Sequence, residues 1–399
     1  MATANPIPET APVAEPLAAE LLVVLTTAVP TEQLDGVLDN LAQAFSVERL
    51  VVATPDEPVG QSSAKLRMVQ TPSPRSGAGW TLRPVEFINA YELGRKHEAR
   101  ALLMLGPGSH SLSSTVLRAL ADTVLNTATD LAMPHYTLPS NSGFINSAIL
   151  YPLSRALFAA RPRFPLALDL CLSMRMAERL AAAAQRFNAP GKDDALLWPV
   201  NEAVAAGYSV DEIDAGPRAI PQPADIDINA ILALVAGSLF GDIESKAAVW
   251  QRPRRPSPAR RPSSDTTPAG SADDVARMVE AFHLAYTNLQ DIWSLILPPH
   301  SMLGLKRFSV VEAGAFRMPE NLWARIVFDF LIAYRLRTIN RGHLMGALIP
   351  LYLAWVAGHI NVTAAGTAPD RHIEEVAAAF EADKPYLVAR WRWPDRFNA

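Results

Sequence analysis

Short apolar runs alternate with amphipathic segments over the first third of the chain. Leu21–Leu25 and Leu50–Ala53 consist only of apolar residues, which is typical of strands buried on both faces of a parallel sheet. Between them, the segment 31–45 carries apolar side chains at helical spacing, so we expect a helix there. The pattern predicts a β-α-β unit at the start of the fold.

The alternation continues to about residue 150. Strands that alternate with helices predict an α/β fold with a mostly parallel sheet flanked by helices, here within residues 20–215. We expect the further strands over 65–69, 100–105 and 130–133, with helices over 84–96 and 113–125. Helical patterns dominate the rest of the chain, over 181–187, 196–206, 226–250, 273–297, 319–340, 343–359 and 372–391.

Two segments lack apolar periodicity. Residues 1–19 are rich in Pro and Ala and have neither basic residues nor the apolar core of a signal peptide, so we expect a disordered leader. Residues 251–272 are rich in Arg, Pro and Ser, which predicts a disordered linker. The organisation that we expect is a leader over 1–19, an α/β domain over 20–250, the linker over 251–272 and an all-helical region over 273–399.

Composition narrows the class of protein. Hydrophobic residues make up 49% of the 399 residues, and the formal net charge of −4 argues against a nucleic-acid partner. Cys171 is the single cysteine, which excludes an intrachain disulfide and fits a reducing, cytoplasmic location. The best candidate for a membrane span is Leu344–Ile360, but it has only about 17 residues and contains Pro350 and His359, so we expect a buried helix instead.

The turn after the first strand argues against a dinucleotide-binding enzyme. Thr26–Pro30 contains no glycine, so the G-x-G-x-x-G fingerprint is missing at this position. The chain also has no P-loop, no G-x-S-x-G elbow and no H-E-x-x-H pair. Its eight histidines are scattered, and none lies at i, i+4 spacing with another ligand.

Residues 134–157, with the sequence PHYTLPSNSGFINSAILYPLSRAL, resemble bacterial family-2-like and mannosylglycerate-synthase-like glycosyltransferases of GT-A fold. The matching positions are Tyr136, Asn146, Tyr151–Leu153 and Arg155–Leu157. The helical stretches 322–337, 348–360 and 384–392 are similar to the tail of the same group. Read together with the strands, the resemblance spans about residues 20–250 and 273–392.

The resemblance implies a GT-A-like fold that binds a nucleotide diphosphate sugar and transfers its hexose to an acceptor, which the sequence does not identify. It places the donor near the strand ends and the acceptor near a set of carboxylates. The implied donor-binding residues are Thr26, Thr27, Asp56, Gly106, Gly108, Arg155 and Arg218. The implied catalytic carboxylates are Asp169, Asp193 and Asp194.

The chain departs from the family pattern at three positions. Members of the group hold Mg²⁺ or Mn²⁺ with an Asp-x-Asp motif at the end of a central strand, but here the strand 101–105 runs into Gly106–His110, which has no carboxylate. The family's G-G-[DE]-F turn is replaced by 165–170, where Asp169 alone remains. The histidine expected within 213–218 is missing, although Gly216 and Arg218 are present. We therefore expect no tight binding of Mg²⁺ or Mn²⁺.

Two interpretations of these losses stay open. In the first, the protein is an active, metal-independent glycosyltransferase, and arginines stabilise the leaving diphosphate; the candidates are Arg155, Arg161, Arg163 and Arg218. In the second, it is a degenerate homologue that binds or scaffolds a partner. A third class, an interaction protein acting through its helical tail, would use that tail as a homo-oligomer contact.

Each candidate carboxylate also has a purely structural interpretation. Asp169 could cap a helix or pair with a nearby arginine, and Asp193 and Asp194 could cap the helix that follows them. Asp56 could belong to a plain turn after the second strand.

Overall fold

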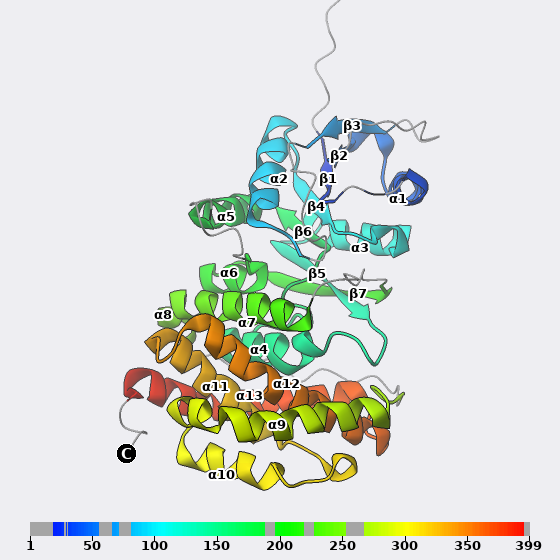
Figure 1. The fold of residues 1–399 in the computed structure, drawn as a ribbon. Coiled ribbons are helices and arrows are strands. Elements are labelled where there is room, and N and C mark those ends of the chain that lie inside the picture. The colour runs from blue at the N-terminus through cyan, green and yellow to red at the C-terminus, as the bar shows by residue number, and fades with distance from the viewer. Residues whose placement is uncertain are drawn as a thin grey trace, which may run out of the picture.

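The structure is a computed structural model that describes residues 19–27, 29, 31–55, 66–71, 81–187, 196–218, 227–252 and 267–394. Figure 1 shows a helix-flanked sheet at the top of the molecule and a group of packed helices below it. The predicted α/β class with a helical C-terminal part is confirmed.

Seven strands form one sheet in the order β3-β2-β1-β4-β6-β5-β7. Neighbouring strands are parallel except around β6, which runs antiparallel to both β4 and β5. All five predicted strands lie in this mixed sheet. The strands are β1 (Leu21–Leu25), β2 (Leu50–Thr54), β3 (Arg67–Gln70), β4 (Ala101–Leu105), β5 (Leu131–Thr137), β6 (Leu170–Ser173) and β7 (Val210–Pro217).

The central strands are apolar throughout because helices cover both faces of the sheet. In β1, Leu21, Val23 and Leu25 belong to the cluster that includes α1 (Thr31–Ala44) and α3 (Ser114–Leu125). Leu22 and Val24 belong to the cluster on the other face, which includes α2 (Pro84–Lys96) and α5 (Met174–Ala184). Successive side chains of a strand point to opposite faces, so each residue of β1 meets a helix.

The remaining helices build the lower part of the molecule (Figure 1). They are α4 (Tyr151–Phe158), α6 (Pro199–Ala206), α7 (Ile228–Ser245), α8 (Ala247–Trp250), α9 (Ala272–Ile296), α10 (Pro299–Phe308), α11 (Glu320–Leu336), α12 (Arg341–Ala364) and α13 (Pro369–Arg392). α9 packs against α12 and α11 packs against α13. The start of α9 is a capping box, in which the Ser271 side chain accepts from the N–H of Asp274 and the Asp274 carboxylate accepts from the N–H of Ser271.

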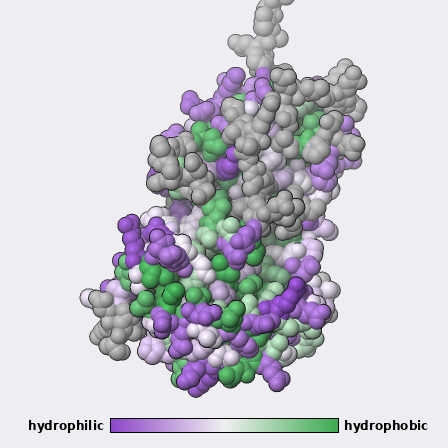
Figure 2. Space-filling view, in the orientation of Figure 1, coloured by the Kyte–Doolittle hydropathy of each residue, from purple (hydrophilic) through white to green (hydrophobic). Residues whose placement is uncertain are grey.

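Two helices among the described residues have the length and hydropathy of a membrane span. In α12, 72% of the most apolar window is buried inside the protein, so the prediction that Leu344–Ile360 forms a buried helix is confirmed. In α7 the corresponding share is 33%. Ile228, at the start of α7, is 45% exposed, and Figure 2 shows apolar side chains at the surface in this region.

Helices from both sides of the linker pack together. α4 contacts α13, and α7 contacts both α11 and α12. The expected leader and linker fall mainly outside the described residues, at 1–18 and 253–266. The predicted domain boundaries therefore stay predictions. The helices α4 and α7, which precede the predicted linker, pack against the C-terminal helices.

Asp130, just before β5, connects the ends of three strands through hydrogen bonds of its side chain. Its carboxylate accepts hydrogen bonds from the Ser173 hydroxyl at the end of β6, from the Arg175 guanidinium and from the Ser209 N–H and hydroxyl before β7. Burial alone would raise the pKa of this carboxyl, but the hydrogen bonds from Arg175, Ser209 and Ser173 outweigh it and bring the pKa to about 2.

Asp130→Asn is expected to lower the free energy of unfolding by about 1–2 kcal/mol at pH 7. The pKa of Asp130 in the folded chain lies below its ordinary value of 3.8, so the stabilisation is complete above that value and is lost as the pH falls toward 2. Urea unfolding of the wild type and the variant between pH 7 and pH ~3 checks this prediction. The difference between their free energies of unfolding should become smaller below pH ~4. If the difference in free energy of unfolding between the two proteins stays constant over this range, the lowered pKa of Asp130 is contradicted.

Candidate functional site

Five chain segments meet at one edge of the sheet. The carboxyl ends of β1, β4, β5 and β7 lie there, and the antiparallel β6 begins there, since Met104 pairs with Leu170. The chain leaves β1 toward β2 on one side, and β4 lies on the other, so β1 and β4 form the topological switch point of the sheet. Open α/β sheets bind ligands outside the carboxyl ends of their strands at such a point.

The turn after β4 passes close beneath the segment that leads into β6. A Cβ atom added to Gly106 would lie 2.6 Å from the Leu168 Cβ, so glycine is required by the close approach of the two segments. Gly108 has a φ of 75°, in the left-handed region, and starts a tight turn over Ser109–Ser111. Gly106 and Gly108 thus both shape the turn at the place where the resemblance puts the donor diphosphate.

Asp169 lies at the centre of this edge and is completely buried. Its carboxylate accepts hydrogen bonds from the Gly106 N–H at 3.0 Å, from the Tyr136 hydroxyl at 2.7 Å, and from Arg218 Nε at 2.9 Å and Arg218 NH2 at 3.2 Å. The ion-pair interpretation of Asp169 is therefore the one that the structure shows. In this state its oxygens are occupied by protein donors.

Arg218, directly after β7, is the partner of Asp169, and both side chains have no solvent exposure. Its guanidinium also donates to the Pro107 carbonyl at 2.9 Å and to the Ser111 hydroxyl at 3.2 Å. Arg218 therefore connects the β4 turn to the segment before β6 through hydrogen bonds. The sequence placed Arg218 at the correct edge, but its contacts there are with the protein itself.

Burial also keeps Tyr136 neutral. The tyrosine sits on β5 with its hydroxyl between the Asp169 carboxylate and the Asp169 N–H, from which it accepts at 3.2 Å. Burial and the neighbouring Asp169 charge hold the pKa of Tyr136 well above its usual range. The phenol is thus a hydrogen-bond donor to Asp169 at any physiological pH.

Arg155 is not at this edge. It lies on α4, 5% exposed at its side chain, and pairs with Glu374 and Glu381 of α13. Burial lowers the pKa of this arginine, but Glu381 and Tyr151 outweigh burial and raise the pKa above its ordinary value, so the guanidinium stays charged. Its two ion pairs join α4 to the C-terminal helix α13.

Of the other predicted residues, Thr26 and Thr27 follow β1 at the switch point. Thr26 is buried, and its N–H and hydroxyl both donate to the Leu105 carbonyl, at 3.0 and 3.1 Å, which joins β1 to β4. Thr27 is half-buried beside it. Asp56, Asp193 and Asp194 lie outside the described residues, so their predicted roles stay predictions.

A cavity of about 720 Å³ opens next to the Asp169–Arg218 pair. At the sheet edge it is lined by Tyr136, Leu168 and Arg218, and elsewhere by residues of α7 and by Tyr352 of α12. Most of the lining side chains are apolar, and the polar ones include Thr81, Asn141, Ser142 and Asn146. A volume of roughly 300–1,000 Å³ with a few polar groups among apolar ones is typical of small-molecule sites.

Sequence reasoning found part of this cavity. Tyr136 and Asn146 were marked by the resemblance but not as site residues, and both line the cavity. The α7 residues Ile228, Ile231 and Val235 were missed as site residues. Their spacing of three and four residues places them on one helix face, but an apolar face gives no signal that it lines a cavity rather than a core.

The described residues at the turn do not fit a site for Mg²⁺ or Mn²⁺. These ions prefer several oxygen ligands with carboxylates among them. Asp169 is the carboxylate nearest the turn in the described part of the chain, and its oxygens are bonded to Gly106, Tyr136 and Arg218. No group of three His, Cys, Asp or Glu side chains able to hold a metal is found among the described residues. We derive no step through a metal, and weak metal binding stays a prediction.

No known family model matches the sequence, and no curated protein matches it. Glucosyl-3-phosphoglycerate synthase from Mycobacterium tuberculosis, solved with Mn²⁺, UDP and glucosyl-3-phosphoglycerate, is 14% identical with a TM-score of 0.39, over 58% of this chain and 81% of that one. CMP:2-keto-3-deoxy-manno-octonic acid synthetase complexed with CTP is 12% identical with a TM-score of 0.33, over 54% of this chain and 97% of that one. At this level of similarity, the ligands of those complexes carry no information about the ligand of this chain.

Proposed function

We propose that this chain binds a nucleotide diphosphate sugar at the carboxyl edge of its sheet and transfers the hexose to an acceptor in the 720 Å³ cavity. The observation that supports it best is the position of that cavity, which begins at the strand ends and extends to α7 and α12. Donor and acceptor need adjoining sites, and this edge provides the switch point of a GT-A-like sheet beside a ligand-sized cavity.

The donor diphosphate would lie at the β4 turn. Gly108 and Ser109 offer backbone N–H groups there, while Pro107 has none. The Ser109 hydroxyl is buried at the turn and has no hydrogen-bond partner among the described residues. In transfer, the acceptor hydroxyl oxygen forms a bond to the anomeric carbon as the bond from that carbon to the diphosphate breaks. The diphosphate leaves with the bonding electron pair, and the hydroxyl proton passes to water. Hydrogen-bond donors near the turn would stabilise the charge that grows on the leaving diphosphate.

A second candidate function is a non-catalytic donor-binding protein on the same fold. The observation that favours it is the buried pair itself, because Asp169 and Arg218 are bonded to each other and neither side chain is exposed to solvent. The two candidates differ in turnover and share donor binding. Both are compatible with a cytoplasmic location, which we propose from the single cysteine of the sequence, the buried Cys171.

Calorimetric titration of the full chain with a panel of nucleotide diphosphate sugars, with and without Mn²⁺, tests the donor site. We expect at least one donor to bind, with an affinity that Mn²⁺ changes by less than about tenfold, since the turn lacks carboxylate ligands. Gly106→Ala should weaken that donor by about tenfold or more, because the new Cβ displaces the turn from Leu168. Gly36→Ala is the matched control, since a Cβ at Gly36 of α1 meets open space.

The outcomes separate the candidates. Donor binding with turnover that survives EDTA supports a metal-independent transferase, and donor binding without turnover of any acceptor supports the non-catalytic protein. No binding of any donor overturns both.

A further inference from the structure

The 720 Å³ cavity is apolar along most of its wall. The side chains that α7 contributes are Ile228, Ile231 and Val235, and Tyr352 comes from α12. Further apolar side chains from the loop after β5 and from the segment before β6 include Leu138, Phe144, Phe164 and Leu166. A wall of this kind favours an apolar occupant, because a hydroxyl or amide group that is moved there from water loses its hydrogen bonds.

The described lining also gives no preference for a charged occupant. Arg218 is the one charged residue among the described residues that line the cavity, and its guanidinium is paired with Asp169. The polar residues of the lining are neutral, and they include Thr81, Asn141, Ser142 and Asn146. A charged acceptor would lose its hydration in this cavity without gaining a counter-ion of its own.

The apolar wall on α7 reaches the surface of the molecule. Ile228 lines the cavity and is also 45% exposed, so it lies where the cavity meets solvent. Over the most apolar window of α7, only 33% is buried inside the protein, in contrast to 72% for α12. An occupant that is longer than the cavity can therefore extend from it over apolar side chains of α7.

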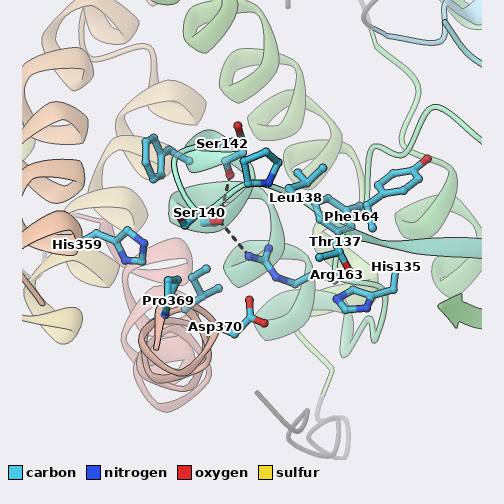
Figure 3. A pocket seen from close by; sticks show the side chains of 16 residues that line it. His135, Thr137, Leu138, Ser140, Ser142, Arg163, Phe164, His359, Pro369 and Asp370 are labelled. Carbon is cyan, nitrogen blue, oxygen red and sulfur yellow. Dashed lines mark hydrogen bonds between the residues drawn. The ribbon is translucent and has the colours of Figure 1, made fainter. Parts of the chain in front are cut away.

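A second cavity, of about 130 Å³, lies between the loop after β5 and the helices α12 and α13, and its lining is different in kind (Figure 3). The polar side chains around it include Ser140, Ser142, Arg163, His359 and Asp370. The two cavities adjoin, since Leu138 and Phe144 line both. The charged groups of this region therefore gather around the small cavity, and the large cavity keeps its apolar wall.

We propose that the acceptor is a lipid-like alcohol whose alkyl chain lies in the large cavity against α7. The inference rests on the proposed function, because it takes the occupant of this cavity to be the acceptor. The hydroxyl end of such an amphiphile lies toward Tyr136 and Arg218 at the strand ends, next to the proposed donor site. Each methylene group that leaves water for the apolar wall increases the affinity, whereas a hydroxyl-rich acceptor finds few partners there.

Methyl NMR of the full chain with ¹³C-labelled isoleucine methyl groups locates the occupant and measures its affinity. Butan-1-ol, hexan-1-ol and octan-1-ol should each shift the methyl signals of Ile228 and Ile231 saturably. The dissociation constant should fall about tenfold for every two methylene groups that are added. Glycerol should leave these signals unchanged. Ile373 lines the small cavity and not the large one, so its methyl signal should respond to none of these alcohols.

Two variants on α7 test whether the alcohols bind at the cavity. Ile231→Ser removes most of an apolar side chain from the wall, so it should raise the dissociation constant of octan-1-ol about tenfold, measured from the Ile228 signal. Leu234→Ser is the matched control and should leave that constant unchanged, because Leu234 is half-buried like Ile231 but does not line the cavity. If Ile231→Ser fails to fold, the series of chain lengths on the wild type still decides the outcome.

The alkyl-chain proposal is overturned if the dissociation constant does not fall with chain length, if glycerol shifts the Ile228 and Ile231 signals, or if both variants weaken octan-1-ol equally. The calorimetric titration of donors is independent of this test. A chain that binds a nucleotide diphosphate sugar but none of the alcohols refutes the alkyl-chain site and leaves the proposed function standing. A chain that binds the alcohols in the expected order but no donor refutes the proposed function and leaves the alkyl-chain site standing.

Discussion

Arg218→Met is expected to lower the free energy of unfolding by about 3–5 kcal/mol, because it leaves the Asp169 carboxylate buried without its counter-ion. Both side chains are fully buried in the wild type, and two of the four hydrogen bonds to Asp169 come from Arg218. Methionine keeps much of the aliphatic volume and removes the charge and the donors. Urea unfolding followed by circular dichroism at pH 7 measures the effect.

Two further variants show that the loss comes from the buried charge. Arg100→Met removes an exposed ion pair with Glu20, whose contribution should be at most about 1 kcal/mol. The double variant Asp169→Leu with Arg218→Met removes both charges, so it should be less destabilised than the sum of its single variants. A loss below about 1 kcal/mol for Arg218→Met would show that the pair is not the element that holds the turn.

The buried ion pair between Asp169 and Arg218 affects how activity data on variants of the protein should be interpreted. Loss of transfer in an Arg218 variant would follow from an altered β4 turn even if the arginine never contacts the donor, because Arg218 bonds Pro107 and Ser111 of that turn. The same holds for Asp169, which accepts from the Gly106 N–H. Variants at the cavity wall and at Gly106 therefore report on ligand binding more directly than variants of the pair.

Three of the five predicted strands are buried on both faces of the sheet. β1, β2 and β4 are uninterrupted apolar runs, and each is buried at all of its positions. β7 was missed because it lies at the edge of the sheet, where Asp211, Glu212 and Asp214 are tolerated and break any apolar pattern. β6 has four residues and passes directly into α5. Its reversed direction has no local signal, since direction depends on pairing with β4.

The sequence predicted where the site lies, at the ends of strands, but not how its residues interact. The position of Gly106 at this edge follows from the predicted strand over 100–105. Those of Asp169 and Arg218 rest on the resemblance alone, because β6 and β7 were not predicted. The mutual hydrogen bonds of the three residues follow from neither. Asp169 and Arg218 are 49 residues apart in sequence, and nothing local distinguishes an ion-paired aspartate from one that faces a ligand. The contact between the His359 and His372 rings was equally hidden, because the two side chains come from different helices.

Ile231→Trp is expected to reduce kcat/KM for transfer by about a hundredfold or more once an acceptor is known, since it places an indole inside the large cavity. Ile231 lies on the α7 face that lines the cavity, together with Ile228 and Val235. Donor affinity measured by calorimetry should change little, because the donor is placed at the β4 turn and the acceptor against α7.

The matched control for this substitution is Ala230→Trp. Ala230 precedes Ile231 on α7 but is exposed and does not line the cavity, so it introduces the same indole one position away from the proposed acceptor site. If both variants fold, bind donor and differ in transfer, the cavity holds the acceptor. If Ile231→Trp transfers as well as Ala230→Trp does, the acceptor binds elsewhere, and the cavity loses its place in the proposed reaction. Because the two variants share a helix and a side chain, this comparison separates filling of the cavity from a general effect of a bulky residue on α7.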